Sequence, residues 1–209
     1  MHNLEVHKLV IATNNEDKLN EIIPFLKDLE ISILSKSDFP DFPEIEENGK
    51  NLEENALLKA RGIYQATGIP VVADDTGLEV DFLNGAPGVY SSRYSGISAS
   101  YDENIQKLLY ELKEVSDDLR TAQFRCVIAF VDDNYEFTVD GVCKGKIIKS
   151  PKGKYGFGYD PVFYVPEFGK TFAQMPRVLK NKISHRGRAL TKIKPHILQY
   201  LRKKVPNYN

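Results

Sequence analysis

The first part of the chain alternates between short apolar runs and stretches in which apolar residues recur every three or four positions. The apolar runs predict strands over residues 8–12 and 31–34 and a strand that begins at Val71. The recurring stretches predict helices over residues 19–29 and 51–67. Strand, tight loop and helix in succession are typical of an α/β layer with a partly parallel sheet.

The second part predicts a different pairing of strands. Residues 121–131 and 135–148 are long alternating runs around turn residues 132–134, so they predict an antiparallel hairpin and a mixed sheet. The other predicted elements are a strand over 78–83, a helix over 101–112 and a last helix from Ser184 to about Arg202, which Pro195 should kink or divide.

Composition narrows the class of protein. With 209 residues and 42% hydrophobic content, the chain can bury a sizeable core, and we expect one domain over residues 1–209. A net charge of -1 gives no sign of a nucleic-acid polymer as partner. Residues 1–7 lack a signal-peptide core, and no apolar run is long enough to span a membrane. Cys126 and Cys143 lie in apolar runs without a zinc pattern, so we expect a reduced, cytoplasmic protein.

Two adjacent acids, Asp74 and Asp75, follow the predicted strand at Val71. Adjacent side chains of a strand point to opposite faces, so the two carboxylates would do different jobs. We expect the chain to turn after Gly77, which would leave the acids at a strand end, where carboxylates can hold Mg²⁺. An Asp-rich turn that only caps the strand is the alternative.

The polar loop from Thr13 to Lys18 joins a predicted strand to a predicted helix. Free backbone N–H groups and the positive end of the helix dipole make such a loop a candidate anion site, to which Lys18 adds a full charge. The Walker A pattern is missing. The alternative is a plain helix cap by Asn15 or Asp17, with Lys18 solvated.

Acids also gather before the second predicted helix. One interpretation is that Glu46 and Glu47 only interact favourably with the dipole of that helix. The alternative is that one of them faces Asp75 across a cleft and binds the same metal ion as Asp75. The residue pattern does not separate the two glutamates.

Two later segments carry candidate binding groups. Residues 155–161 alternate aromatics with glycines, so a ring there could stack on a base, or the aromatics could pack inward. Ser184 is a candidate N-cap, and His185, Arg186 and Arg188 follow it in the first helical turn, where the dipole disfavours cations. A bound phosphate or polar base would explain those cations, and so would a solvated helix start.

Together these features predict an enzyme that acts on a nucleoside triphosphate with Mg²⁺. An aspartyl-phosphate phosphatase would want Asp-x-Asp, whereas here the acids are adjacent. A nucleotide sensor that does not hydrolyse its ligand is a second alternative. A single-strand RNA binder would need a broad basic face, which the net charge does not indicate.

Six segments in order resemble the inosine triphosphate pyrophosphatase family, which acts on deaminated purine nucleoside triphosphates. They are residues 12–18, 53–60, 73–78, 85–94, 156–161 and 184–187. The resemblance implies hydrolysis of ITP, dITP and XTP to the monophosphate and pyrophosphate, dependence on Mg²⁺, and a homodimer. It also implies an elongated two-lobed α/β fold with a mixed central sheet flanked by helices and an active-site cleft between the lobes.

The resemblance also implies roles for individual residues. Asp75 matches the proton acceptor and lies near the metal, with Glu46 or Glu47 as the other metal carboxylate. Lys18 matches a residue of the catalytic phosphate loop, and Thr76 stands where a serine is common. Asn14 replaces a small residue, so we expect only its backbone to act. The remaining matched substrate positions are Thr13, Asn15, Phe157, Gly158, Tyr159, Asp160, Lys180, His185 and Arg186.

Overall fold

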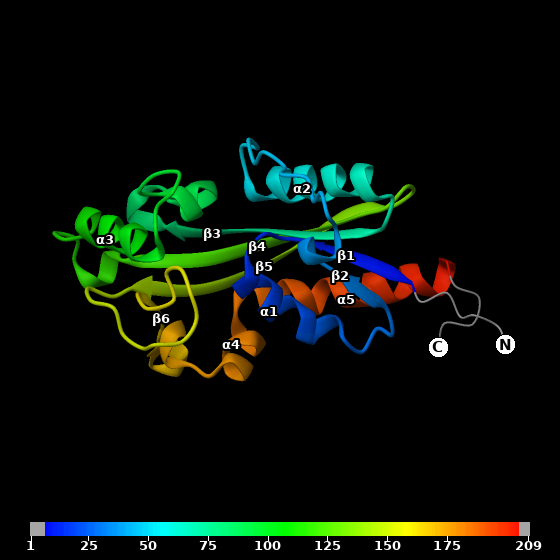
Figure 1. The fold of residues 1–209 in the computed structure, drawn as a ribbon. Coiled ribbons are helices and arrows are strands. Elements are labelled where there is room, and N and C mark those ends of the chain that lie inside the picture. The colour runs from blue at the N-terminus through cyan, green and yellow to red at the C-terminus, as the bar shows by residue number, and fades with distance from the viewer. Residues whose placement is uncertain (1–6, 205–209) are drawn as a thin grey trace. The chain divides into compact units, whose positions relative to one another are not determined.

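A computed structural model, which describes residues 7–204, contains one mixed seven-stranded sheet in the order β2-β1-β3-β4-β5-β6-β7 (Figure 1). The strands are β1 (Lys8–Ala12), β2 (Ser32–Leu34), β3 (Val71–Val80), β4 (Thr121–Val131), β5 (Glu136–Ile147), β6 (Phe163–Val165) and β7 (Lys170–Thr171). Strand β1 pairs in parallel with β2 and β3, whereas β5–β6 and β6–β7 are antiparallel pairs. The predicted mixed α/β fold is confirmed.

The helices follow the predicted periodicity closely. They are α1 (Glu16–Leu26), α2 (Leu52–Thr67), α3 (Tyr101–Glu111), α4 (Arg177–Ile183) and α5 (His185–Lys204). Pro195 lies inside α5 and does not divide it. The short elements α4, β6 and β7 were not predicted, because two to seven residues are too few to show a period.

Strand β3 corrects the prediction of a turn after Gly77. The strand runs unbroken through Asp74, Asp75 and Gly77 to Val80, and the predicted strand over 78–83 ends in a short 3₁₀ helix, Asp81–Leu83. Gly77 is needed for a close approach instead of a turn, since a Cβ there would lie 2.6 Å from the carbonyl oxygen of Gly88.

The contacts divide the chain into two compact units. Among the described residues, the first unit comprises residues 7–75, 127–140 and 189–204, and the second comprises 76–126 and 141–188. Within the first unit, α2 covers one face of the strands, and α1 and α5 cover the other (Figure 1). The buried apolar positions are Ile22 and Leu26 on α1, Ala56, Ala60 and Ile63 on α2, and Ile193 and Ile197 on α5.

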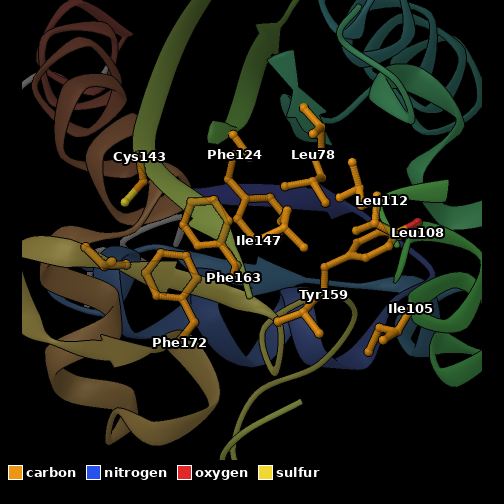
Figure 2. Packing of buried hydrophobic residues seen from close by; sticks show 14 of the residues in the cluster. Leu78, Ile105, Leu108, Leu112, Phe124, Cys143, Ile147, Tyr159, Phe163 and Phe172 are labelled. Carbon is orange, nitrogen blue, oxygen red and sulfur yellow. The ribbon is translucent and has the colours of Figure 1, made fainter. Parts of the chain in front are cut away.

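The second unit has a core of aromatic and aliphatic side chains (Figure 2). The ring of Phe124 lies 4.6 Å from that of Phe163 and is stacked on that of Phe172. Leu108 of α3 and Leu112, which caps the end of α3, also belong to the cluster. This core packs on the second unit's parts of β3, β4 and β5.

Two further findings concern the membrane and the cysteines. No helix between residues 7 and 204 is long and apolar enough to cross a membrane. Cys126 and Cys143 are buried and form no disulfide, and burial raises the pKa of the Cys143 thiol to about 11.

Candidate active site

The loop after β1 is held by its own side chains. The Thr13 hydroxyl oxygen accepts a hydrogen bond from the backbone N–H of Asn15, at 3.1 Å. The side chain of Asn15 caps α1 by accepting from the N–H of Lys18, also at 3.1 Å, so the capping role expected as one alternative is confirmed for Asn15. Asn14 is exposed. These hydrogen bonds fix the backbone of the first turn of α1, from which the Lys18 side chain extends.

Lys18 is not simply solvated. Its ammonium lies 3.2 Å from an oxygen of Asp74, and the exposed fractions of the two side chains are 17% and 0%. Because β3 is extended here, Asp74 and Asp75 point to opposite faces, as the sequence predicted. Asp74 meets Lys18 of α1, whereas Asp75 meets α2, and these helices lie on opposite sides of the strands (Figure 1).

Asp75 sits among side chains of the α2 region. Asn55 donates to one of its oxygens at 3.1 Å, and the Lys59 ammonium lies 3.8 Å from the other. Burial raises the pKa of the Asp75 carboxyl; Lys59 and Lys18 oppose this shift, and the charge of Glu47 adds to it.

The two candidate metal glutamates differ in position. Glu47 is half-buried, with an oxygen 3.2 Å from the Lys59 ammonium, while Glu46 is exposed. Among residues 7–204 there is no group of three or more His, Cys, Asp or Glu side chains that could hold a metal. Two carboxylates fit Mg²⁺, which commonly takes one or two protein carboxylates and completes its shell with water and substrate phosphate.

Sequence reasoning missed Asn55 and Lys59. Asn55 is fully buried and spans two groups, since its amide oxygen also accepts from the N–H of Gly49 at 2.8 Å. Lys59 donates to the backbone carbonyl of Asp74 at 2.5 Å. A signal was present, because positions 55 and 59 fall on the apolar stripe of Leu52, Ala56, Ala60 and Ile63, where polar residues need a reason.

In the second unit, Asp160 organises the aromatic loop. One of its oxygens accepts from the N–H of Phe157 at 3.0 Å and from the Lys180 ammonium at 2.5 Å, and the side chains of Asp160 and Lys180 are at most 4% exposed. Gly156 has a φ of +74°, and a Cβ there would lie 2.0 Å from the same carboxylate. The loop is therefore shaped around one buried ion pair.

Cations gather around the ring of Phe157. The Lys180 nitrogen lies 4.8 Å and the Arg186 guanidinium carbon 5.7 Å from its centroid, within the range of cation–π contacts. Arg186 is 1% exposed and donates to the Thr76 hydroxyl at 3.1 Å. His185 is also buried and stacks on Phe124, with ring centroids 4.5 Å apart. Ser184 accepts from the N–H of Gly187, which agrees with its predicted N-cap role.

Tyr159 faces a different environment from Phe157. It is 5% exposed, belongs to the core in Figure 2, and its hydroxyl donates to the Ser91 carbonyl at 2.9 Å, while burial raises its pKa. Inward packing, one of the two alternatives for the aromatic loop, is therefore correct for Tyr159. Phe157 and Gly158 are half-buried.

The structure thus brings most of the predicted residues into two groups. In the first unit, Thr13, Asn15, Lys18 and Asp74 form one network, and Glu47 and Asp75 meet at Lys59. In the second unit, Thr76, Phe157, Asp160, Lys180 and Arg186 are in contact, and His185 precedes Arg186. The peptide bond between Asp75 and Thr76 joins the groups. Their chemistry is complementary, because one offers hard oxygens and lysines and the other offers donors beside an aromatic ring.

Comparison with known proteins extends this picture. A dITP/XTP pyrophosphatase from Geobacter sulfurreducens is 52% identical over 191 residues, which cover 91% of this chain and 96% of that protein. A dITP/XTP pyrophosphatase from Vibrio cholerae is 46% identical over 189 residues, covering 89% and 94%.

Solved structures of similar proteins have the same fold. A HAM1 protein from Coxiella burnetii has a TM-score of 0.85 at 44% identity, covering 93% of this chain and 100% of that one. The Staphylococcus aureus Ham1 protein has a TM-score of 0.83 at 40% identity, covering 92% and 99%. A model described as the Ham1 family matches residues 9–196, and the chain therefore belongs to the Ham1 family.

Proposed function

We propose that this chain is a Mg²⁺-dependent pyrophosphatase that hydrolyses ITP, dITP and XTP to the monophosphate and pyrophosphate, removing deaminated purines from the nucleotide pool. Its relatives named as dITP/XTP pyrophosphatases support the substrate class. The observation that carries the proposal is the pair of buried, consecutive carboxylates, Asp74 and Asp75, which face different lysines from different helices.

Asp75 is the proposed proton acceptor. A water attacks the α-phosphorus and gives its proton to Asp75, while the bond from that phosphorus to the bridging oxygen breaks and pyrophosphate leaves. Burial raises the pKa of this carboxyl while no metal is bound to it. The Lys18 ammonium then stabilises negative charge on the phosphate oxygens. Loop N–H groups other than those of Thr13, Asn15 and Lys18, which donate within the protein, can add to this.

Glu47 and Asp75 are the proposed metal ligands. The sequence left a choice between Glu46 and Glu47. We favour Glu47, because it is half-buried near Lys59 whereas Glu46 is exposed. Bound Mg²⁺ would supply neutralisation of phosphate charge.

Base recognition is assigned to the second unit. Lys180 and Arg186 are buried donors beside Phe157, and the buried His185 precedes Arg186 and stacks on Phe124. A 6-keto oxygen can accept from such donors, and the Phe157 ring can stack on the base. A 6-amino group cannot accept, and it would leave a buried donor unpaired, which discriminates strongly against ATP. GTP carries the same 6-keto oxygen, so its slow hydrolysis has to come from its 2-amino group instead.

Three wider features belong to the same proposal. The strands β3, β4 and β5 pass from one unit to the other, so we treat the chain as a single functional domain. The family resemblance supports a homodimer, and light scattering should then give twice the chain mass of 23.7 kDa. Buried, unbridged cysteines support a cytoplasmic location.

Substrate choice gives the most direct test. With Mg²⁺, the protein should release pyrophosphate rapidly from ITP, dITP and XTP and slowly from ATP and GTP, and EDTA should abolish release. Release of orthophosphate, or binding without turnover as in a nucleotide sensor, would contradict the proposal.

Asp75→Asn should lower kcat by about 10²–10⁴-fold, since the amide keeps the shape but cannot take the proton. Asp117→Asn is the matched control, because Asp117 is 71% exposed and pairs with Lys149 on the surface. Single-turnover kinetics on ITP would measure both, and near-normal turnover by Asp75→Asn would remove its catalytic role.

Asp160→Asn should destabilise the protein by about 3–5 kcal/mol, because the buried Lys180 ammonium loses its counter-charge. It should also weaken discrimination between ITP and ATP, since a neutral amide oxygen holds the Phe157 loop less strongly than the carboxylate does. Urea unfolding measures the first effect and the ratio of kcat/KM values the second. With Asp117→Asn as control, equal stability of both variants would show that the pair contributes little.

A further inference from the structure

Lys59 occupies a position that a metal ion would be expected to prefer. Its ammonium has three oxygen neighbours: Glu47 at 3.2 Å, Asp75 at 3.8 Å and the backbone carbonyl of Asp74 at 2.5 Å. The side chain is 13% exposed, so little water competes for these oxygens. The ammonium donates a hydrogen bond to the Asp74 carbonyl and forms ion pairs with the two carboxylates, of which Asp75 is the more distant.

Those oxygens are of the kind that a hard cation selects. Two of them belong to Glu47 and Asp75, the carboxylates to which the proposed function assigns Mg²⁺. Lys59 brings one positive charge to two negative ones, whereas Mg²⁺ would bring two. Both cations at the same carboxylates would repel each other at short range in a poorly solvated site, so they compete.

We propose that Lys59 is a built-in counter-cation, which holds Glu47 and Asp75 together in the metal-free protein and leaves them when the metal binds. This inference rests on the proposed function, because it takes the metal ligands from it. The lysine stem has four rotatable carbons, and α2 itself need not move for the ammonium to withdraw. The lysine charge thereby offsets the repulsion between the two carboxylates and keeps them in place for a metal. Because the metal has to displace that charge, it binds more weakly than it would to the same carboxylates without Lys59.

The test compares metal binding by Lys59→Met with that by the wild-type protein. Mn²⁺ is the probe, and the electron paramagnetic resonance signal of free Mn²⁺ gives the dissociation constant without any turnover. Lys59→Met should bind Mn²⁺ on the order of tenfold more tightly, because the competing charge is gone. Mg²⁺ should also raise its melting temperature more than that of the wild type, since its two carboxylates lack a counter-charge until metal binds.

Two glutamate variants separate the inference from the proposed function. Glu47→Gln should weaken Mn²⁺ binding, and its exposed neighbour variant Glu46→Gln should not. If Glu47→Gln binds Mn²⁺ as the wild type does, the ligand assignment of the proposed function fails. If Glu47→Gln weakens binding but Lys59→Met binds Mn²⁺ equally or less well, the ligand assignment stands and the displacement of Lys59 is wrong.

A second measurement needs no variant and applies even if Lys59→Met does not fold. Acetylation of the wild-type protein by acetic anhydride, read by peptide mass spectrometry, should label Lys59 faster once Mg²⁺ is added. The exposed lysine Lys149 serves as the internal reference for reagent reactivity. Unchanged or slower labelling of Lys59 relative to Lys149 would overturn the inference.

Discussion

The extended backbone of β3 is the constraint on which both groups of polar side chains depend. It carries Asp74, Asp75 and Thr76 in succession, and strand geometry sends neighbouring side chains to opposite faces. Asp74 is thereby directed to Lys18, Asp75 to Asn55, and Thr76 to Arg186. A turn at this point would have removed the alternation, and the approach of Gly77 to Gly88 belongs to the continuous strand.

Buried charge is the second theme, because a charge removed from water is tolerated only with close partners. Lys18, Lys59 and Lys180 each lie next to a carboxylate that is wholly or partly buried. Two of these lysines meet the consecutive carboxylates Asp74 and Asp75 of β3, and the third shapes the aromatic loop. The protein therefore fixes the electrostatic arrangement of its candidate site through its own side chains, before any ligand arrives.

Local periodicity was sufficient to predict most of the fold. The strand over 8–12, the cap at Asn15 and the β4–β5 hairpin follow from patterns contained within a few residues. What failed had a tertiary cause: the need for glycine at position 77 comes from a carbonyl eleven positions away in sequence, at Gly88. A turn and a close approach both select glycine, so the residue type alone could not separate them.

The candidate site shows the same division. Family resemblance supplied the positions now found in contact around Phe157, and residue chemistry alone left Glu46 and Glu47 equivalent. Their difference depends on which side chain reaches Lys59, and that depends on how the segment before α2 lies against the helix. Asn55 and Lys59 were detectable only as polar residues that interrupt an apolar stripe. Such an interruption shows which positions need an explanation, but it does not show which residues they contact.

The path of the chain between the two compact units determines whether either unit can be produced or exchanged by itself. Each unit is assembled from separate segments, since β3, β4 and β5 each begin in one unit and end in the other. No single truncation point would release either unit as a contiguous polypeptide. A single crossover between related genes could therefore not exchange one unit without also combining segments of different origin in the other.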